Sequence, residues 1–388
     1  MPTQTFKKGS STKIKRSHRL NAPKTPQELG YRMPAEWERH EATWFSWPHN
    51  EETFPEHLHD AQFTIARCIK EITKETAASL SEHVNLIVRN ETDRKQAQAA
   101  LDFWAISPDA YSFYELANND VWIRDYGPLF ISRPKEEASN PLAGVSFRFD
   151  GWGGKDETYY GSSAGADDRI ARSICDALNL PCFDADIVLE GGAIDGNGQG
   201  TCLTTKNCLL DRAAGPSQEE WEKHLYDNLG FEKVLWLEGA NFDGDDTEGH
   251  VDNLTRFVGP HEVVTMLTSD KNDPWYEPLQ ANLKQLHSMR DADGRQLDVI
   301  PIELPAPFYL NAILDGVRGR RRYPASYANF IIGNSVVLVP TYADANDLKA
   351  LDALSMCFPE RDIIPIDCSR YILGQGALHC SSQQQPAR

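Results

Sequence analysis

Residues 188–205, VLEGGAIDGNGQGTCLTT, contain the pattern that decides the fold. Strand-forming runs at 188–194 and 201–205 flank four turn-forming residues at 195–198. This spacing is typical of two antiparallel strands joined by a tight turn. Apolar residues at four-residue intervals then predict a helix that ends near Leu229 and opens with a capping box of Ser217 and Glu220. The stretch therefore predicts one unit of strand, turn, strand and helix.

The same unit recurs along the chain at irregular spacing. Further strand pairs are predicted at 254–258 with 262–267 and at 327–332 with 335–339, each around a glycine-containing turn. Because strand pairs alternate with helices, the order favours pseudo-symmetric α/β modules over a doubly wound parallel sheet. Apolar periodicity and capping residues predict the other helices at 61–72, at 170–178, from Trp275 after Asp273 and Pro274, and from Asn346 or Asp347 to about Cys357.

Length and composition fit one large globular domain. The chain has 388 residues, of which 40% are hydrophobic and 25% charged. No long linker divides it, so we expect a single catalytic domain over 29–388. No apolar run approaches the roughly 18 residues that a membrane helix needs, and the N-terminus does not resemble a secretory signal. These features predict a soluble, cytoplasmic protein without a membrane partner.

Charge is distributed unevenly along the chain. The formal net charge is −18, although seven lysines and arginines precede the first acidic residue, Glu28. We interpret residues 1–28 as a basic, disordered tail. An organelle-targeting segment is the alternative, but the tail lacks a convincing apolar helical face. The rest of the chain is therefore strongly acidic, which disfavours nucleic acid and anionic surfaces and favours a small cationic ligand.

Eight cysteines are spread over the chain without a CxxC pair, so neither a disulfide scaffold nor a structural zinc site is predicted. Free cysteine is among the most buried residue types, and most of these thiols are interpreted as small core residues. Cys380 is the exception, because it follows the glycine-led stretch 373–376. We expect Cys380 at the end of a short strand, with its thiol protruding.

Charged side chains interrupt two apolar stretches. Arg124 and Asp125 lie within the strand-like run 119–128. One interpretation is an internal ion pair, since a buried charge must be compensated; the other is a carboxylate that faces a pocket from the end of a strand. Glu190 ends a second apolar run just before two glycines, where it is either a turn residue or a group that faces a ligand.

The segment 249–252 carries the clearest pair of polar groups. In a strand, His250 and Asp252 would project from the same face, with Val251 buried behind them. A histidine with a purely structural role is the alternative. In the same way, His379 and Cys380 would face opposite sides of a strand, so His379 is poorly placed to act as the base for that thiol. His250 is therefore the best candidate for this base.

Together these residues supply three carboxylates, one imidazole and one thiol. Such a set is too acidic for a cysteine protease, which needs an oxyanion hole and a neutral or hydrogen-bonding partner for its histidine. It suits an electrophile that is itself a permanent cation. A guanidinium group keeps its charge and offers five donors in a planar fork, so flanking carboxylates can hold its carbon against the thiol.

Several motifs make the chain resemble the agmatine deiminases, within the broader peptidylarginine-deiminase-like group of guanidino-modifying enzymes. The similarity extends from Tyr31 to the C-terminus. It implies a five-bladed α/β propeller of pseudo-fivefold symmetry, the pentein type, with the active site on the central axis. The motifs that carry it occur in order at 33–38, 44–49, 122–128, 149–154, 189–192, 249–253, 326–330 and 379–386.

The resemblance also implies roles and a reaction. Agmatine would be converted into N-carbamoylputrescine and ammonia through a covalent amidino-thioether, as a step of putrescine biosynthesis, without a metal or cofactor. It allows a homo-oligomer. The resemblance implies that Cys380 is the nucleophile, that His250 is the general acid and base, and that Asp125 and Asp252 are the carboxylates that grip the guanidinium. Glu190 would be a bridge to His250 or the substrate. Trp122 would be a pocket wall that can contact a cation, and Asn329 would lie near the substrate.

Some residues depart from the family pattern. Gln375 replaces a glycine, Ala377 replaces an asparagine, and Ser381 and Ser382 follow the nucleophile. These departures leave free or peptidyl arginine as the alternative substrate. The arginines at 318 and 320–322, expected in a solvated loop, could then receive a carboxylate.

Two further classes remain as alternatives. One is a metal-dependent hydrolase that uses His250, Asp252, Glu190 and Cys380 as ligands, although one histidine is few for a zinc centre. The other is a binding protein that has lost catalysis, which is disfavoured because every expected acid, base and nucleophile position is filled.

Overall fold

The structure, a computed structural model, describes residues 24–74, 82–134, 140–154, 165–211, 215–239, 244–314 and 317–388. Most of the predicted basic tail lies outside these ranges. Of its last residues, Thr25 and Glu28 hydrogen-bond to each other at the 3-10 helix Gln27–Leu29. No helix in the described ranges is long and apolar enough to cross a membrane.

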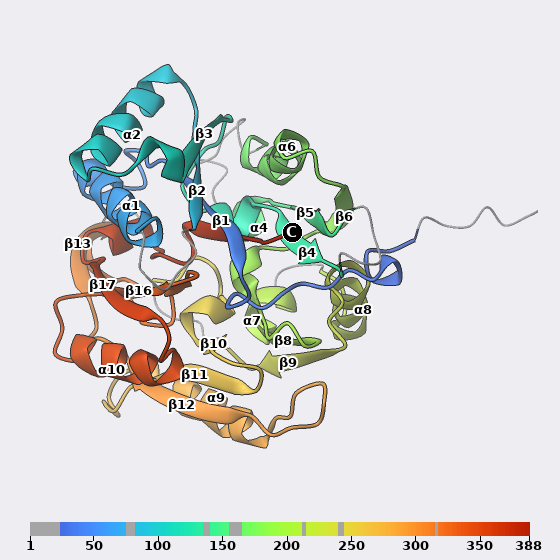
Figure 1. Cartoon of the computed structure of the whole chain (residues 1–388). Helices are drawn as coiled ribbons and strands as arrows, with labels where there is room; N and C mark the ends of the chain where they lie inside the picture. The colour runs from blue at the N-terminus through green and yellow to red at the C-terminus, as the bar shows by residue number, and fades with distance from the viewer. Residues whose placement is uncertain are drawn as a thin grey trace, which may run out of the picture.

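One structural module repeats around the molecule, as Figure 1 shows. In each module, two antiparallel strands are followed by a helix and by a third strand that runs parallel to the second. Four of these modules, within the described ranges, follow in sequence order: β4 (Leu129–Ser132), β5 (Leu142–Arg148), α6 (Ile170–Ala177) and β6 (Cys182–Val188); β7 (Ile194–Gly196), β8 (Thr201–Thr205), α8 (Gln218–Leu229) and β9 (Lys233–Leu237); β10 (Thr255–Phe257), β11 (Glu262–Leu267), α9 (Tyr276–Ser288) and β12 (Asp298–Glu303); β15 (Ile331–Ile332), β16 (Val336–Thr341), α10 (Asp347–Cys357) and β17 (Asp362–Asp367).

The fifth module is assembled from both ends of the chain. Its first strand is the C-terminal β18 (Ser382–Pro386), which pairs antiparallel with β1 (His40–Ser46). The next strand of this sheet runs parallel to β1, and a further strand extends the sheet. The ring of five modules is thereby closed, and the predicted five-bladed α/β propeller is confirmed. The remaining elements of this module are α1 (Leu58–Ile72), β2 (His83–Val88), α2 (Glu91–Phe103) and β3 (Tyr111–Glu115).

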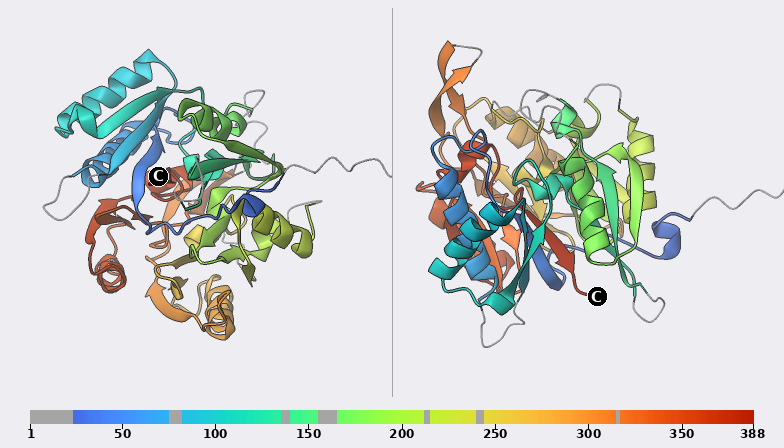
Figure 2. Two further views of the ribbon diagram at one scale, coloured as in Figure 1. Left: turned by 45° about the vertical axis from the view of Figure 1, so that its right-hand side comes forward. Right: turned by 90° about the horizontal axis from the view of Figure 1, so that it is seen from above.

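A separate hairpin projects from the ring, as the right-hand view of Figure 2 shows. It consists of β13 (Tyr309–Leu314) and β14 (Val317–Arg322). The arginines of 318–322 were expected in a loop, and this expectation is wrong, because they belong to β14. Short helices complete the fold at α3 (Ile123–Tyr126), α4 (Gly151–Gly154), α7 (Lys206–Leu209) and, as 3-10 helices, Pro108–Ala110, Asp167–Arg169, Gly191–Ala193, Val251–Asn253 and Tyr371–Gly374.

The core lies between the sheets and the helices around them. The predicted apolar faces of the helices are the buried ones: Ile65, Ile69 and Ile72 of α1 are fully covered. The capping box that was predicted for α8 is present between Ser217 and Glu220. Helices therefore form where apolar periodicity and capping residues agree, and their burial holds each module together.

The chain segments that lead into the first strands were predicted less well. Residues 119–128 were expected to form a strand, yet Ile123–Tyr126 is a helical turn. The strand predicted at 188–194 is interrupted by the 3-10 helix Gly191–Ala193, and 249–252 also enters a 3-10 helix. These expectations are wrong for one physical reason. Each segment turns a charged side chain inward, and strand periodicity cannot describe a backbone that bends to do so.

Cys380 is likewise not at the end of a strand. It lies in the turn before β18, and its backbone carbonyl accepts a hydrogen bond from the Arg124 N–H at 3.2 Å. The position of the thiol is therefore fixed by a turn that contacts another module.

Candidate active site

The predicted site residues come from equivalent places in the five modules. Each precedes the first strand of its module: Asp125 before β4, Glu190 before β7, His250 before β10, Asn329 before β15 and Cys380 before β18. In Figure 1 these first strands face the centre of the ring. The repeated fold thus brings together residues that lie up to 255 positions apart in the sequence.

The thiol of Cys380 is almost completely buried. Its sulfur lies 3.1 Å from the amide nitrogen of Asn329 and 3.6 Å from a carboxylate oxygen of Asp252. Burial raises the pKa of Cys380 well above its ordinary value, and the charges of Asp252 and Asp125 raise it further. The site without substrate therefore favours the protonated thiol. Asn329, expected near the substrate, in fact contacts the sulfur.

His379 is held between two carboxylates. Its Nδ1 lies 2.8 Å from Oδ2 of Asp252, and its Nε2 lies 3.0 Å from Oε2 of Glu36. Burial alone would raise the pKa of Asp252, but His379 and the nearby cations outweigh burial and lower it. Asp252 therefore remains ionised beside the thiol, and His379 orients this carboxylate.

His250 lies among acidic groups and is fully buried. Its Nδ1 is 3.8 Å from Asp125, and its Nε2 is 3.8 Å from Glu190. Burial lowers the pKa of His250, yet Asp125, then Cys208 and Glu190, raise it well above the ordinary value. The geometry therefore favours an imidazolium that can give a proton to a leaving group.

The backbone at Gly192 explains why His250, Asp125 and Asp252 converge. A Cβ added there would lie 2.6 Å from His250 Nδ1, 2.9 Å from Asp125 and 3.1 Å from Asp252. The N–H of Gly192 also donates to Asp125 at 2.9 Å. His250 and Asp252 thus do face a common centre, as predicted, although Asp252 lies in the 3-10 helix Val251–Asn253 and His250 directly precedes it, so neither belongs to a strand.

Asp125 is oriented by a second donor, Trp152, whose indole N–H lies 2.9 Å from the other carboxylate oxygen. Trp152 adopts a left-handed backbone with φ of 57°, which is rare for a bulky residue and occurs mainly at functional sites. Burial raises the pKa of Asp125, and repulsion from Asp252 and Glu190 raises it further. The attraction of His250 lowers this pKa but does not cancel the rise. A bound cation would relieve this repulsion.

A pocket of about 290 Å³ opens above Cys380 and Asp125. Trp122 and Trp152 line it, so the pocket wall that was predicted for Trp122 lies where expected. Trp122 also packs in the core. Gly376 lies so close to its ring that a Cβ atom added at this glycine would be only 2.5 Å away. Aromatic, acidic and thiol groups therefore line one pocket.

The outer part of the pocket carries charges of both signs. Asp246 and Glu52 line it together with Arg321. Burial and the neighbouring Asp245 raise the pKa of Asp246 to about 7, against the attraction of Arg321. Arg322, by contrast, points away from this pocket, because it is buried in a bidentate ion pair with Asp273.

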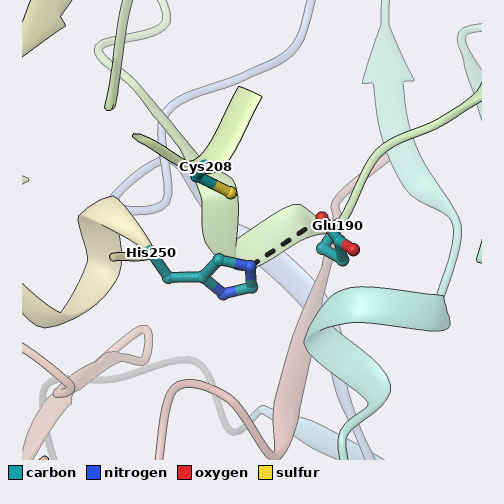
Figure 3. Close-up of side chains that lie close together, drawn as sticks. All are labelled: Glu190, Cys208 and His250. Carbon is teal, nitrogen blue, oxygen red and sulfur yellow. Dashed lines mark ion pairs between the residues drawn. The ribbon is translucent and has the colours of Figure 1, made fainter. Parts of the chain in front are cut away.

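Sequence reasoning missed several groups of the site. Cys208 was assigned to the core, yet its sulfur, a nitrogen of His250 and an oxygen of Glu190 all lie within 4.8 Å of one another (Figure 3). Trp152 and Asp246 were missed as well. These atoms are of the types that zinc accepts, and an imidazole beside a carboxylate is equally suited to acid–base chemistry. A lone cysteine gives no sequence signal for such a contact.

Comparisons with known proteins identify relatives over nearly the full length of this chain. The family model of Porphyromonas-type peptidyl-arginine deiminases matches residues 32–386. Two curated agmatine deiminases are similar over nearly their full length. The enzyme of Medicago truncatula is 34% identical, and the match covers 95% of this chain and 100% of the relative. The enzyme of Stutzerimonas stutzeri is 37% identical, and the match covers 94% of this chain and 97% of the relative. The solved structure of agmatine deiminase of Enterococcus faecalis has a TM-score of 0.82 at 33% identity, covering 95% of this chain and 99% of its own.

Proposed function

This chain belongs to the Porphyromonas-type peptidyl-arginine deiminase family, and we propose that it hydrolyses agmatine to N-carbamoylputrescine and ammonia. The observation that carries the proposal is a buried thiol in a pocket that the carboxylates of Asp125, Asp246 and Glu52 also line. Agmatine has a guanidinium at one end and an ammonium at the other, so each acidic region has a matching charge. The product places the reaction in putrescine biosynthesis.

We propose that the guanidinium binds between Asp125 and Asp252, with its carbon next to Cys380. Its positive charge would offset the two carboxylates that raise the pKa of the thiol. The thiol would then lose its proton to solvent, and the thiolate would attack the guanidinium carbon. Substrate binding would therefore activate the nucleophile, and the acidity of the site would suit a cationic substrate only.

The remaining steps use His250. Attack gives a neutral tetrahedral carbon, and the His250 imidazolium protonates one amino group, which leaves as ammonia. A cationic amidino-thioether stays attached to Cys380. The now neutral imidazole accepts a proton from water as the water oxygen bonds to the carbon. His250 is thereby protonated again. The tetrahedral carbon then collapses: the C–S bond breaks, the hydroxyl proton passes to the departing sulfur, and the ureido product is released with Cys380 restored as a thiol.

The carboxylates of the two outer residues Asp246 and Glu52 would receive the ammonium of agmatine. Arg321 lines the same region and supports the alternative, free or peptidyl arginine, because its guanidinium could receive a carboxylate. We favour agmatine because two acids, Asp246 and Glu52, line this region together with one arginine, Arg321.

Steady-state kinetics with agmatine, free arginine and a peptide with C-terminal arginine tests the choice of substrate. We expect the highest kcat/KM for agmatine. Asp246→Asn should raise KM for agmatine about tenfold, and the matched change Arg321→Gln should leave it within about threefold. If Arg321→Gln weakened arginine turnover while agmatine reacted no faster than arginine, the alternative would hold and agmatine would be the wrong substrate.

We also propose that the enzyme works in a reducing compartment, as expected for the cytoplasm. All eight cysteines are free in the structure, including the proposed nucleophile. Oxidation of Cys380 would block attack on the substrate, so the chemistry needs conditions that keep this thiol reduced.

A further inference from the structure

Cys208 is a second buried thiol next to the site, and the mechanism above does not use it. It is fully buried in α7, and its sulfur belongs to the cluster with Glu190 and His250 that Figure 3 shows. Cys208 is absent from the residues that line the pocket. Of the two thiols, Cys380 lines the pocket, whereas the sulfur of Cys208 lies within 4.8 Å of His250 and Glu190. We therefore expect Cys208 to act through one of these two residues.

One hydroxyl group links Cys208 to the backbone next to His250. The side chain of Thr205 accepts a hydrogen bond from the Cys208 N–H at 3.4 Å, which caps the first turn of α7. The same hydroxyl donates to the carbonyl of Gly249 at 2.7 Å. Because Gly249 directly precedes His250, this bond fixes the distance between α7 and the histidine. The contact of Cys208 with the ring is thus built into the fold.

The ring of His250 needs such a contact. Within the described residues, neither of its nitrogens makes an ordinary hydrogen bond, and the carboxylates of Asp125 and Glu190 lie 3.8 Å away. A histidine that passes protons must keep its ring orientation in both protonation states. A carboxylate partner would favour the charged form alone. A thiol can accept from an imidazolium N–H and can donate weakly to a neutral ring.

We propose that Cys208 is a positioning residue for His250: its sulfur holds the imidazole in the orientation that proton exchange with the substrate requires. The role rests on the proposed function, since it serves the same two proton transfers. Cys208 forms no bond with substrate, and no electron or atom moves to or from its sulfur.

Several groups face His250 and must be considered together. Asp125 comes from α3, Glu190 from the segment before Gly191–Ala193, and Asp252 from the 3-10 helix Val251–Asn253. Asp246 also interacts with it electrostatically. Removal of Cys208 leaves all four carboxyl groups in place. Any change in the behaviour of His250 in a Cys208 variant therefore comes from the sulfur.

Three variants test the proposal in the full chain: Cys208→Ala, Cys208→Ser and the control Cys202→Ala. Cys202 lies in the same buried cluster as Cys208 and is equally buried. Cys202→Ala therefore also removes one sulfur atom from this core. We expect Cys208→Ala to lower kcat for agmatine by about 10- to 100-fold while KM stays within about threefold. Cys208→Ser should recover part of this loss, because its hydroxyl can still hydrogen-bond.

The pH profile and NMR provide readouts that a packing defect would not change. Because Cys208 helps to raise the pKa of His250, Cys208→Ala should move the basic limb of the kcat profile to lower pH. The ¹⁵N signals of the His250 ring should titrate at lower pH in the same variant, with or without substrate. Cys202→Ala should shift the thermal midpoint similarly and leave both readouts unchanged.

The outcomes separate this role from the proposed function. If Cys208→Ala matched Cys202→Ala in kcat, pH profile and His250 signals, the positioning role would be wrong, whatever the substrate. If the wild-type enzyme failed to turn over agmatine while the His250 signals still responded to Cys208→Ala, the choice of substrate would fail and the positioning role would stand.

Discussion

Gln375 occupies a backbone position that favours glycine. Its φ is 77°, in the left-handed region, and its side chain lines the pocket. A non-glycine residue there costs about 1 kcal/mol or more, whereas glycine adopts this conformation without a steric penalty. We expect Gln375→Gly to raise the free energy of unfolding by roughly 0.5–1 kcal/mol in chemical denaturation. A destabilised variant would mean that contacts of the Gln375 side chain outweigh the backbone strain.

Asp246 should make the stability of the protein depend on pH. Its pKa is raised to about 7 in the folded state, while an unfolded aspartate has a pKa of about 3.9. The folded state therefore binds the proton more tightly, and stability falls as pH rises from about 4 to about 7. Asp246→Asn removes this fall. The difference in unfolding free energy between Asp246→Asn and the wild type should therefore rise by roughly 1–3 kcal/mol from pH 5 to pH 8, in favour of the variant. Parallel curves for the two proteins would contradict this prediction.

At the scale of single residues, the sequence predicted the groups that carry an unusual charge or a distinctive setting. Asp125 interrupts an apolar run, and Cys380 follows glycines, so both could be found. Cys208 gave no such signal, because a lone cysteine is most often a small core residue. Trp152 lies in the family motif 149–154, but the sequence shows no partner for its indole. Their roles depend on contacts with His250 and Asp125, which only the folded chain creates.

At the scale of elements, the short turn at Gly192 holds three site residues together. Gly192→Ala would place a methyl group against His250, Asp125 and Asp252 at 2.6–3.1 Å, closer than ordinary contact. Displacement of these groups by about an ångström should lower kcat/KM for agmatine by at least about 100-fold. The control Gly333→Ala adds the same methyl outside the site, at 3.2 Å or more from its neighbours. Equal activity of both variants would show that Gly192 does not set the site geometry.

The helices could be predicted from sequence because their signals are local. The capping box of α8 and the apolar face of α1 are complete within one segment. The segments before β4, β7 and β10 could not be predicted in the same way. Their backbone bends because a buried carboxylate or imidazole contacts groups from another module. For example, the carboxylate of Asp125 accepts a hydrogen bond from the N–H of Gly192. Such long-range contacts override local strand periodicity.

At the scale of the whole molecule, Arg256 joins several modules at the centre. Its guanidinium forms ion pairs with Glu36 and Asp195 and donates to the carbonyls of Ala328 and Phe330 at 3.1 Å. Arg256→Met would leave two buried carboxylates without this partner and should lower the unfolding free energy by about 3–5 kcal/mol in chemical denaturation. A loss below about 1 kcal/mol would mean that the ring does not depend on this central arginine.

The repeated α/β module was predictable because it is visible in the sequence as alternating strand pairs and helices, whereas the five-bladed ring was implied by the resemblance to the family. Its closure leaves no such local pattern, since the pairing of β18 with β1 joins segments about 340 positions apart. The closure places Cys380 at the centre, directly before β18.

The central claim is that Cys380 forms a covalent bond with the substrate. Intact mass spectrometry of the enzyme, acid-quenched during turnover of agmatine, tests this claim most directly. We predict a mass increase equal to agmatine minus ammonia, located at Cys380 and absent from Cys380→Ser. A Cys380→Ser enzyme that still turned over agmatine, or an adduct on a different residue, would contradict the account.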